Sequence, residues 1–253
     1  MRVVTKVYPT DMEYLTLYPI GDVHYGAAEC MERDFGDYLK RIEQDDTAAV
    51  VILGDLINNG IRSSVTNCFE EVHTPREQKL GMLDMLHTVR HKIVAGVRGN
   101  HEYRTVKDAD IDIMEDIFRE LDLGGCYMRN AGILKVSVGQ KYNRKPATYS
   151  FYINHGQGGG ITIAGGINRQ NSMQLSVEGV DGILSGHTHK PSKIPSGRLI
   201  FDSRNNKVTH ANTLIYVCTA WMEYGGYAEK AVMPPVAFLP RNGGSKWLIA
   251  ERL

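Results

Sequence analysis

The sequence predicts an α/β fold, because apolar runs typical of buried strands alternate with segments of helical periodicity. Residues 50–53 (Val-Val-Ile-Leu) form an apolar run that ends at a Gly-Asp pair, and residues 92–97 form a similar run that ends at Arg-Gly-Asn. A segment with one apolar helical face lies before each of these runs. This β-α-β order favours parallel strands with helices packed against the sheet.

Three helices are expected in the first half of the chain. The second begins at Thr74, which fits an N-cap because Pro75 follows it and Glu77 lies three residues later. The third runs from about residue 109 to residue 121, has an acidic outer face, and ends before a Gly-Gly pair. The apolar faces comprise, for the three helices in order, Met31, Phe35, Tyr38, Leu39 and Ile42; Leu80, Leu83, Leu86, Val89 and Ile93; and Ile113, Ile117, Phe118 and Leu121.

The second half of the chain is richer in short strand-like runs, with one short helix expected near residues 171–178. The runs cover residues 133–138, 149–153, 182–184 and 213–218. Because no linker, internal repeat or low-complexity tract separates the two halves, we expect residues 1–253 to form a single domain.

The composition excludes several classes of protein. Apolar residues make up 42% of the chain and charged residues 23%, which is ordinary for a globular protein. Lys and Arg together number 29, as do Asp and Glu, so the whole molecule has no net field that attracts nucleic acid or an anionic membrane. No apolar run reaches the roughly 20 residues that span a bilayer, and the N-terminus lacks the apolar core of a signal peptide. Four well-separated cysteines without a C-x-x-C pair fit free thiols, so we expect a cytoplasmic protein without a membrane partner.

Residues that can bind a metal ion follow nearly every predicted strand. The motifs are Gly21-Asp22-Val23-His24, Gly54-Asp55-Leu56-Ile57-Asn58, Gly99-Asn100-His101-Glu102, Asn154-His155-Gly156 and Gly186-His187-Thr188-His189. Because open α/β sheets bind ligands outside the carboxyl ends of their strands, these side chains can converge there. Carboxylate oxygens and imidazole nitrogens without thiolates suit Mn, Fe, Zn, Ni or Co. Seven candidate ligands are too many for one tetrahedral zinc, which indicates two metal ions that share a carboxylate.

The ordered motifs resemble those of the calcineurin-like metallophosphoesterase superfamily, and they span residues 21–189. The resemblance implies a four-layer α-β-β-α sandwich of two mixed sheets flanked by helices. It also implies that Asp55 bridges two divalent ions, with Mn²⁺ as the favoured metal, one held by Asp22, His24 and His189 and the other by Asn100, His155 and His187. A hydroxide bridging the ions would attack phosphorus in line, and His101 would protonate the leaving oxygen as general acid.

One departure from the family pattern bears on the substrate. Many phosphatases of the superfamily have an Asp three residues after the bridging Asp, where it pairs with the acid histidine, but this chain has Asn58. A neutral amide raises the pKa of His101 less than a carboxylate would. Residues 70–78 (EEVHTPREQ) and 224–229 (YGGYAE) also resemble phosphoesterases of phages and prophages. These features favour a phosphodiesterase acting on a nucleotide or nucleic acid, and the balanced charge favours a small or single-stranded substrate over a duplex.

Two alternatives stay open. A phosphomonoesterase, such as a nucleotidase or a phosphoprotein phosphatase, would use the same ligands, and a non-catalytic scaffold would use the same fold. No candidate ligand is replaced by an inert residue, which argues against the scaffold. The candidate substrate-binding residues are Asn58, Arg104, Arg169, Tyr224 and Tyr227, and Arg98 also lies beside a motif. Each arginine is equally consistent with an ordinary surface role, and the tyrosines are also consistent with packing near Trp221.

Overall fold

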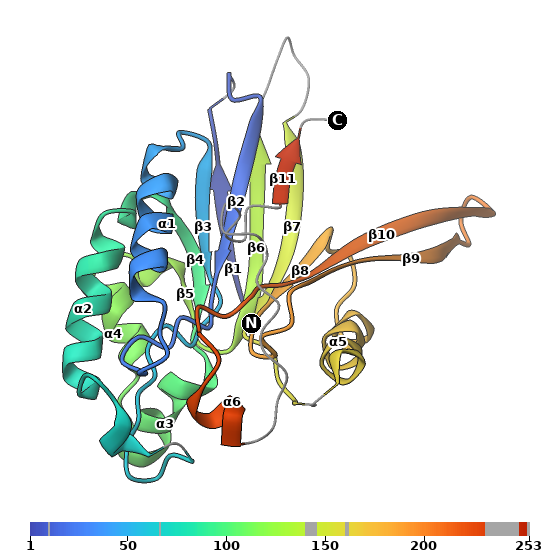
Figure 1. The fold of residues 1–253 in the computed structure, drawn as a ribbon. Coiled ribbons are helices and arrows are strands. Elements are labelled where there is room, and N and C mark those ends of the chain that lie inside the picture. Colours follow the sequence, from blue (N-terminus) through green and yellow to red (C-terminus); the bar gives the residue numbers. More distant parts are fainter. Residues whose placement is uncertain (10, 66, 140–145, 160–161, 231–247, 252–253) are drawn as a thin grey trace.

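Two β-sheets lie face to face and form the centre of the molecule (Figure 1). The fold is that of a computed structural model, which describes residues 1–9, 11–65, 67–139, 146–159, 162–230 and 248–251. No helix within these ranges is long and apolar enough to cross a membrane. The four cysteines are free thiols, as expected.

The five-stranded sheet contains the predicted β-α-β elements. Its parallel strands are β2 (Tyr14–Ile20), β3 (Ala48–Ile52), β4 (Ile93–Val97) and β5 (Tyr127–Met128), and β11 (Leu248–Glu251) pairs antiparallel with β2. Every residue of β3 and β4 is buried, which is typical of central parallel strands covered on both faces. Helices α1 (Glu32–Gln44), α2 (Pro75–His87) and α4 (Ile113–Glu120) pack on the outer face of this sheet (Figure 1).

The six-stranded sheet combines the N-terminal strand with the second half of the chain. Its strands in spatial order are β1 (Arg2–Val7), β6 (Ala131–Val138), β7 (Ala147–Asn154), β8 (Gly182–Ser185), β10 (Lys207–Val217) and β9 (Ser192–Asp202). The sheet is mixed, since β6 and β7 are antiparallel whereas β7, β8 and β10 are parallel. Helix α5 (Ile163–Asn171) and a 3-10 turn (Ser172–Leu175) follow β7, and Met173 of that turn packs against Ile183 and Ile215 on the outer face.

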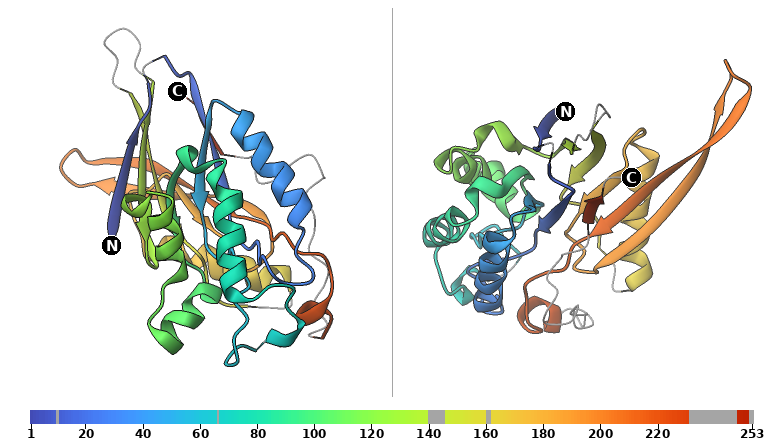
Figure 2. Two further views of the ribbon diagram at one scale, coloured as in Figure 1. Left: turned by 90° about the vertical axis from the view of Figure 1, so that its left-hand side faces the viewer. Right: turned by 90° about the horizontal axis from the view of Figure 1, so that it is seen from above.

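Three apolar layers hold the elements together. One, which includes Phe35, Ile52 and Phe118, lies between the helices and the five-stranded sheet. The second, between the two sheets, includes Leu17 and Phe151, and the third lies between the six-stranded sheet and the 3-10 turn that follows α5. The layers therefore run helix, sheet, sheet, helix, and Figure 2 shows them from two further sides. This arrangement confirms the predicted four-layer fold.

The structure corrects three predictions about helices. The helix expected over residues 109–121 is α4, and its predicted inward residues are buried, but it begins later than predicted, at Ile113. The separate helix α3 (Asn100–Ala109) ends at Asp110 in a left-handed conformation, and Asp112 caps α4. The helix expected near residues 171–178 is wrong, because α5 ends at Asn171 and only the 3-10 turn follows.

The third correction concerns the apolar face of α2, whose capping box at Thr74 is confirmed. Leu80 is 49% exposed rather than directed inward. The buried line of this helix is Gln78, Met82 and Leu86, which are four residues apart and therefore lie above one another. Gln78 belongs to it although it is polar, because its side-chain oxygen accepts the Asn59 backbone N–H at 2.7 Å.

We predict that Lys92→Met lowers the free energy of unfolding by about 2 kcal/mol, within the range for hydrogen bonds to charged groups. The buried ammonium group of Lys92 donates to the carbonyl oxygens of Ile42, Glu43 and Asp45 at 2.7–2.8 Å and so completes the end of α1. Urea denaturation measures the loss, with the exposed Lys40→Met as the matched control. Equal losses in both variants would show that the cap contributes nothing of its own.

Candidate metal centre

The seven candidate ligands lie at one edge of the two sheets, where five strands end. Asp22 and His24 follow β2, Asp55 follows β3, Asn100 follows β4, His155 follows β7, and His187 and His189 follow β8. The strands bring these residues together although they are up to 167 positions apart in the sequence.

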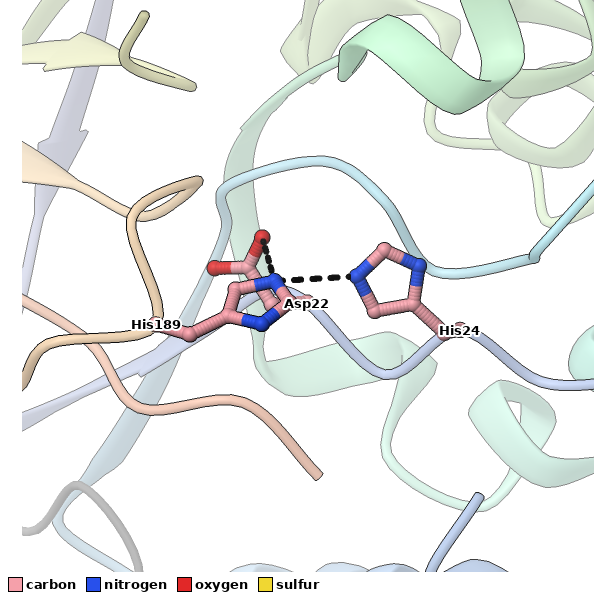
Figure 3. Close-up of side chains that lie close together, drawn as sticks. All are labelled: Asp22, His24 and His189. Carbon is pink, nitrogen blue, oxygen red and sulfur yellow. Dashed lines mark hydrogen bonds and ion pairs between the residues drawn. The ribbon is translucent and has the colours of Figure 1, made fainter. Parts of the chain in front are cut away.

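Asp22, His24 and His189 form the first group, and one ligand atom from each lies within 4.8 Å of the others. The Nε2 atom of His189 lies 3.5 Å from Asp22 Oδ1 and 3.1 Å from His24 Nε2. Figure 3 shows the two imidazoles meeting from opposite sides, with the Asp22 carboxylate beside them. The first group thus offers one oxygen and two nitrogens to a common centre.

Asp55, His155 and His187 form a second group, which Asn100 joins. The Nε2 atom of His155 lies 3.2 Å from Asp55 Oδ2, 3.0 Å from Asn100 Oδ1 and 3.3 Å from His187 Nδ1. Asp55 also lies within 4.8 Å of ligand atoms on His24 and His101. Asp55 is therefore shared between a histidine of the first group and the histidines of the second.

The backbone at the site is held in a conformation that side chains seldom adopt. Five of the seven candidate ligands have a positive φ: Asp22 (53°), His24 (52°), Asp55 (51°), His187 (70°) and His189 (54°). Such residues cost on the order of 1–3 kcal/mol each and cluster at functional sites, where surrounding contacts impose them. Glycines make room for this geometry, since a Cβ on Gly99 would collide with Asp55 Oδ1 and one on Gly186 with Asp22 Oδ2.

The electrostatics keep the carboxylates ionised. Burial alone would raise the pKa of Asp55, but His155 and His101 outweigh burial and lower that pKa well below its usual range. Burial and then the neighbouring His101 lower the pKa of His24, so this imidazole is neutral. Burial opposes a charge on His155 too, yet the Asp55 carboxylate raises the pKa of His155 to about 10. A positive charge beside Asp55 is therefore stabilised, either as a proton on His155 Nε2 or as a metal ion that takes the place of this proton.

These residues fit divalent cations. A ring nitrogen of His24 faces one of His189, and a ring nitrogen of His155 faces one of His187. Two unprotonated ring nitrogens in such a contact both present lone pairs, which a shared cation can accept. The Nδ1 atom of His155 lies 2.6 Å from the Leu53 carbonyl oxygen, which favours a proton on Nδ1 and leaves the Nε2 lone pair for a metal ion. Oxygen and imidazole donors without sulfur are the set that Mn, Fe, Zn, Ni or Co accept.

Glu102, which was not among the predicted site residues, is fully buried behind the ligands. Its Oε2 accepts the backbone N–H groups of Gly99 (2.8 Å) and Asp55 (3.0 Å), and its Oε1 accepts those of Leu56 (2.8 Å) and Ile57 (3.3 Å). One carboxylate thus ties the loop that carries Asp55 to the start of α3. The sequence feature that could have indicated this role is the spacing, because Glu102 lies three residues after Gly99, where an acidic side chain caps the start of a helix.

His101 lies beside the ligands, and its ring packs against that of His24 with centroids 4.4 Å apart. Its Nδ1 lies 2.7 Å from the backbone oxygen of Asn58, so the backbone rather than the Asn58 amide orients the ring. The Asn58 amide instead donates to Glu71 at 2.8 Å. Burial and, to a smaller extent, Arg104 lower the pKa of His101 to about 4 against the opposing effect of Asp55. The lowered pKa agrees in direction with the expectation that Asn58 supports a charge on His101 less than a carboxylate would.

The candidate substrate-binding residues differ in position. Arg104 faces the site, because its Nη2 lies 3.0 Å from His101 Nε2 and its Nη1 donates to the Asn58 carbonyl. Arg98 is engaged elsewhere, in a 2.6 Å ion pair with Asp112. Arg169 is exposed and donates to Gln157.

The two candidate tyrosines follow the six-stranded sheet. Tyr224 is 49% exposed, so its ring is not buried against Trp221. Trp221 packs between Phe35 and Tyr38. Tyr227 belongs to the short helix α6 (Gly226–Lys230), and its side chain lies outside the described residues.

The fold and the site together define a metal-dependent phosphoester hydrolase. The family model for calcineurin-like phosphoesterases matches residues 15–191, which is more than half of the chain. The chain therefore belongs to the calcineurin-like phosphoesterase family, whose members use divalent metal ions. Among the solved structures similar to it is the calcineurin-like phosphoesterase YfkN from Bacillus subtilis, which is 13% identical, with 83% of this chain and 82% of that chain covered and a TM-score of 0.40. No curated protein matches the sequence.

Proposed function

We propose that this phosphoesterase hydrolyses phosphodiesters, those of a nucleotide or of a nucleic acid, at a centre of two divalent ions. The observation that supports the proposal most directly is the position of Asp55 between the histidines of two ligand groups. Mn²⁺ is the proposed metal because it accepts both carboxylate oxygens and imidazole nitrogens.

The ligand groups divide naturally between two ions. Asp22, His24 and His189 would hold one ion, Asn100, His155 and His187 would hold the other, and Asp55 would contact both. When bound, the ions supply the Lewis acidity that activates water and neutralises charge on the phosphoryl oxygens. Asn100 offers an oxygen without a negative charge, which keeps the site from repelling an anionic substrate.

His101 and Arg104 are placed to act on the substrate itself. The Asn58 carbonyl holds Nδ1 of His101, so Nε2 is the atom that would carry a proton to the leaving oxygen. Without substrate, Arg104 Nη2 donates to that same atom, so Nε2 is the acceptor in this contact. A non-bridging phosphoryl oxygen of a bound ester would take over the Arg104 donor and leave Nε2 to carry the proton. Both side chains approach from α3, on the side of Asp55 where His24 also lies.

The charge beside His101 favours a diester over a monoester. Arg98 is paired with Asp112 and Arg169 is bonded to Gln157, so of the three candidate arginines only Arg104 contacts His101. A phosphodiester has one negative charge, whereas a monoester has up to two and requires more compensating cations. One guanidinium at the site matches the smaller charge.

Hydrolysis of two chromogenic esters tests this proposal. After metal stripping and addition of Mn²⁺, we expect kcat/KM for bis-p-nitrophenyl phosphate to exceed that for p-nitrophenyl phosphate at least tenfold, with no turnover in EDTA. We expect His101→Ala to lower kcat for both esters by about 10²-fold, the lower end of the usual effect of general acids. Faster hydrolysis of the monoester would identify a phosphomonoesterase, and absence of turnover with every divalent ion would favour the non-catalytic scaffold.

A further inference from the structure

Strands β9 and β10 form a long arm that projects from the body of the protein. Eleven residues of each strand pair, from Ser192 with Val217 at the base to Asp202 with Lys207 at the tip. Only residues 214–217 of β10 also pair with β8, so the outer part of the arm is a two-stranded ribbon. Figures 1 and 2 show this ribbon extending beyond every other element.

The arm concentrates positive charge in a chain that is neutral as a whole. Residues 192–217 contain four basic residues and one acidic residue, a net charge of +3, so the rest of the chain has a net charge of −3. The side chains of Lys193, Arg204 and Lys207 are exposed, and none of the ion pairs among the described residues involves them. The acidic residue, Asp202, accepts backbone N–H groups of the turn at the tip.

The base of the arm lies at the candidate metal centre. Strand β9 begins three residues after His189. Strand β10 ends just before Cys218, whose Sγ lies 3.7 Å from Asp22 Oδ2. Eleven extended residues span about 35 Å, which is close to one turn of a nucleic-acid duplex. A polymer bound along the arm would therefore reach the metal centre at one end.

We propose that the β9–β10 arm binds double-stranded nucleic acid and directs it to the metal centre. This inference rests on the proposed function and specifies its substrate class. It replaces the small or single-stranded substrate that the balanced charge of the whole chain favours, because the positive charge is gathered on the arm. A two-stranded ribbon fits the major groove of a duplex, and free cations at its tip match the phosphate backbone. Leu199, Phe201 and Val208 are exposed apolar residues on one face of the ribbon, where they could contact thymine methyl groups in the major groove.

Charge reversal at the tip tests the arm separately from catalysis. We measure fluorescence anisotropy of a labelled 20-base-pair duplex and the matching single strand, with the full chain in EDTA at 50 and 200 mM NaCl. The arm variant is Arg204→Glu with Lys207→Glu, and the control is Arg33→Glu with Lys135→Glu, which changes the net charge equally on exposed residues of α1 and β6. We expect the arm variant to weaken duplex binding at least tenfold and to lower the salt slope by about two, since each phosphate contact contributes about one. We expect the control to stay within twofold of the wild type.

Hydrolysis of bis-p-nitrophenyl phosphate distinguishes failure of the arm from failure of the proposed function. The small ester does not need the arm, so the arm variant retains wild-type turnover if the proposal holds. The proposal would be overturned if the arm variant bound the duplex as tightly as the wild type does. It would also be overturned if the wild type bound only the single strand. Conversion of a dimer to a monomer by the arm variant in light scattering, with unchanged duplex binding, would assign the arm to a second copy of the chain. Arm-dependent duplex binding by a wild-type protein that hydrolyses neither ester would support the arm and reject the proposed phosphodiesterase.

Discussion

Asp55→Asn is expected to lower kcat/KM for bis-p-nitrophenyl phosphate by at least 10³-fold, which corresponds to about 4 kcal/mol of transition-state stabilisation. Asp55 is the residue proposed to contact both ions, and the substitution by Asn removes its negative charge. Asn preserves the shape of the side chain and tolerates the left-handed backbone found at this position, where φ is 51°. The carbonyl oxygen of the introduced amide can still accept the His101 backbone N–H that Oδ1 of Asp55 accepts at 2.8 Å. Loss of activity would therefore report the charge and not the fold.

Metal content measured by elemental analysis after desalting gives a second readout of the same variant. We expect two Mn²⁺ per chain in the wild type and at most one in Asp55→Asn. Asp181→Asn is the matched control, because Asp181 accepts a backbone N–H from Ser150 at 2.7 Å but lies away from the site on the exposed side of the six-stranded sheet. Wild-type turnover by Asp55→Asn, or equal losses in both variants, would contradict the shared role of Asp55.

The parts of the fold that the sequence predicts well are those whose cause is local. Strands β3 and β4 are buried on both faces, so they appear as continuous apolar runs, and the residues that follow them are the candidate ligands. Because parallel strands end at one edge, the position of Asp55 and Asn100 follows from the strand predictions alone. The left-handed backbone at Asp55 and at four other ligands does not follow from the strand predictions, since it depends on contacts between loops that are distant in sequence.

Two elements escaped prediction because their stability comes from distant contacts. Helix α3 has no apolar face, and the one residue it buries is Glu102, whose partners lie up to 47 positions earlier in the chain. The arm was expected only over residues 213–218, because the burial of β10 that produces an apolar run is confined to its end near β8. The outer part of the ribbon exposes both faces and therefore has no hydrophobic pattern to detect.

Glu102→Ala is expected to lower the free energy of unfolding by at least 3 kcal/mol. The substitution leaves the backbone N–H groups of Gly99, Asp55, Leu56 and Ile57 without their acceptor, and each unsatisfied buried donor costs about 1–3 kcal/mol before relaxation. Urea denaturation of the metal-free protein measures the loss, with Glu115→Ala as the matched control.

Glu115 pairs with exposed Arg119 and Arg129, and such surface pairs contribute at most about 1 kcal/mol. Glu102→Gln should give an intermediate loss, because its carbonyl oxygen can still accept from Leu56 and Ile57 while its amide faces the N–H groups of Asp55 and Gly99. The same order, wild type above Gln above Ala, is expected for Mn²⁺ affinity, because the Asp55 loop must be held for the ligands to converge. An Ala variant within 1 kcal/mol of the wild type would show that water replaces the carboxylate, and that Glu102 does not set the geometry of the site.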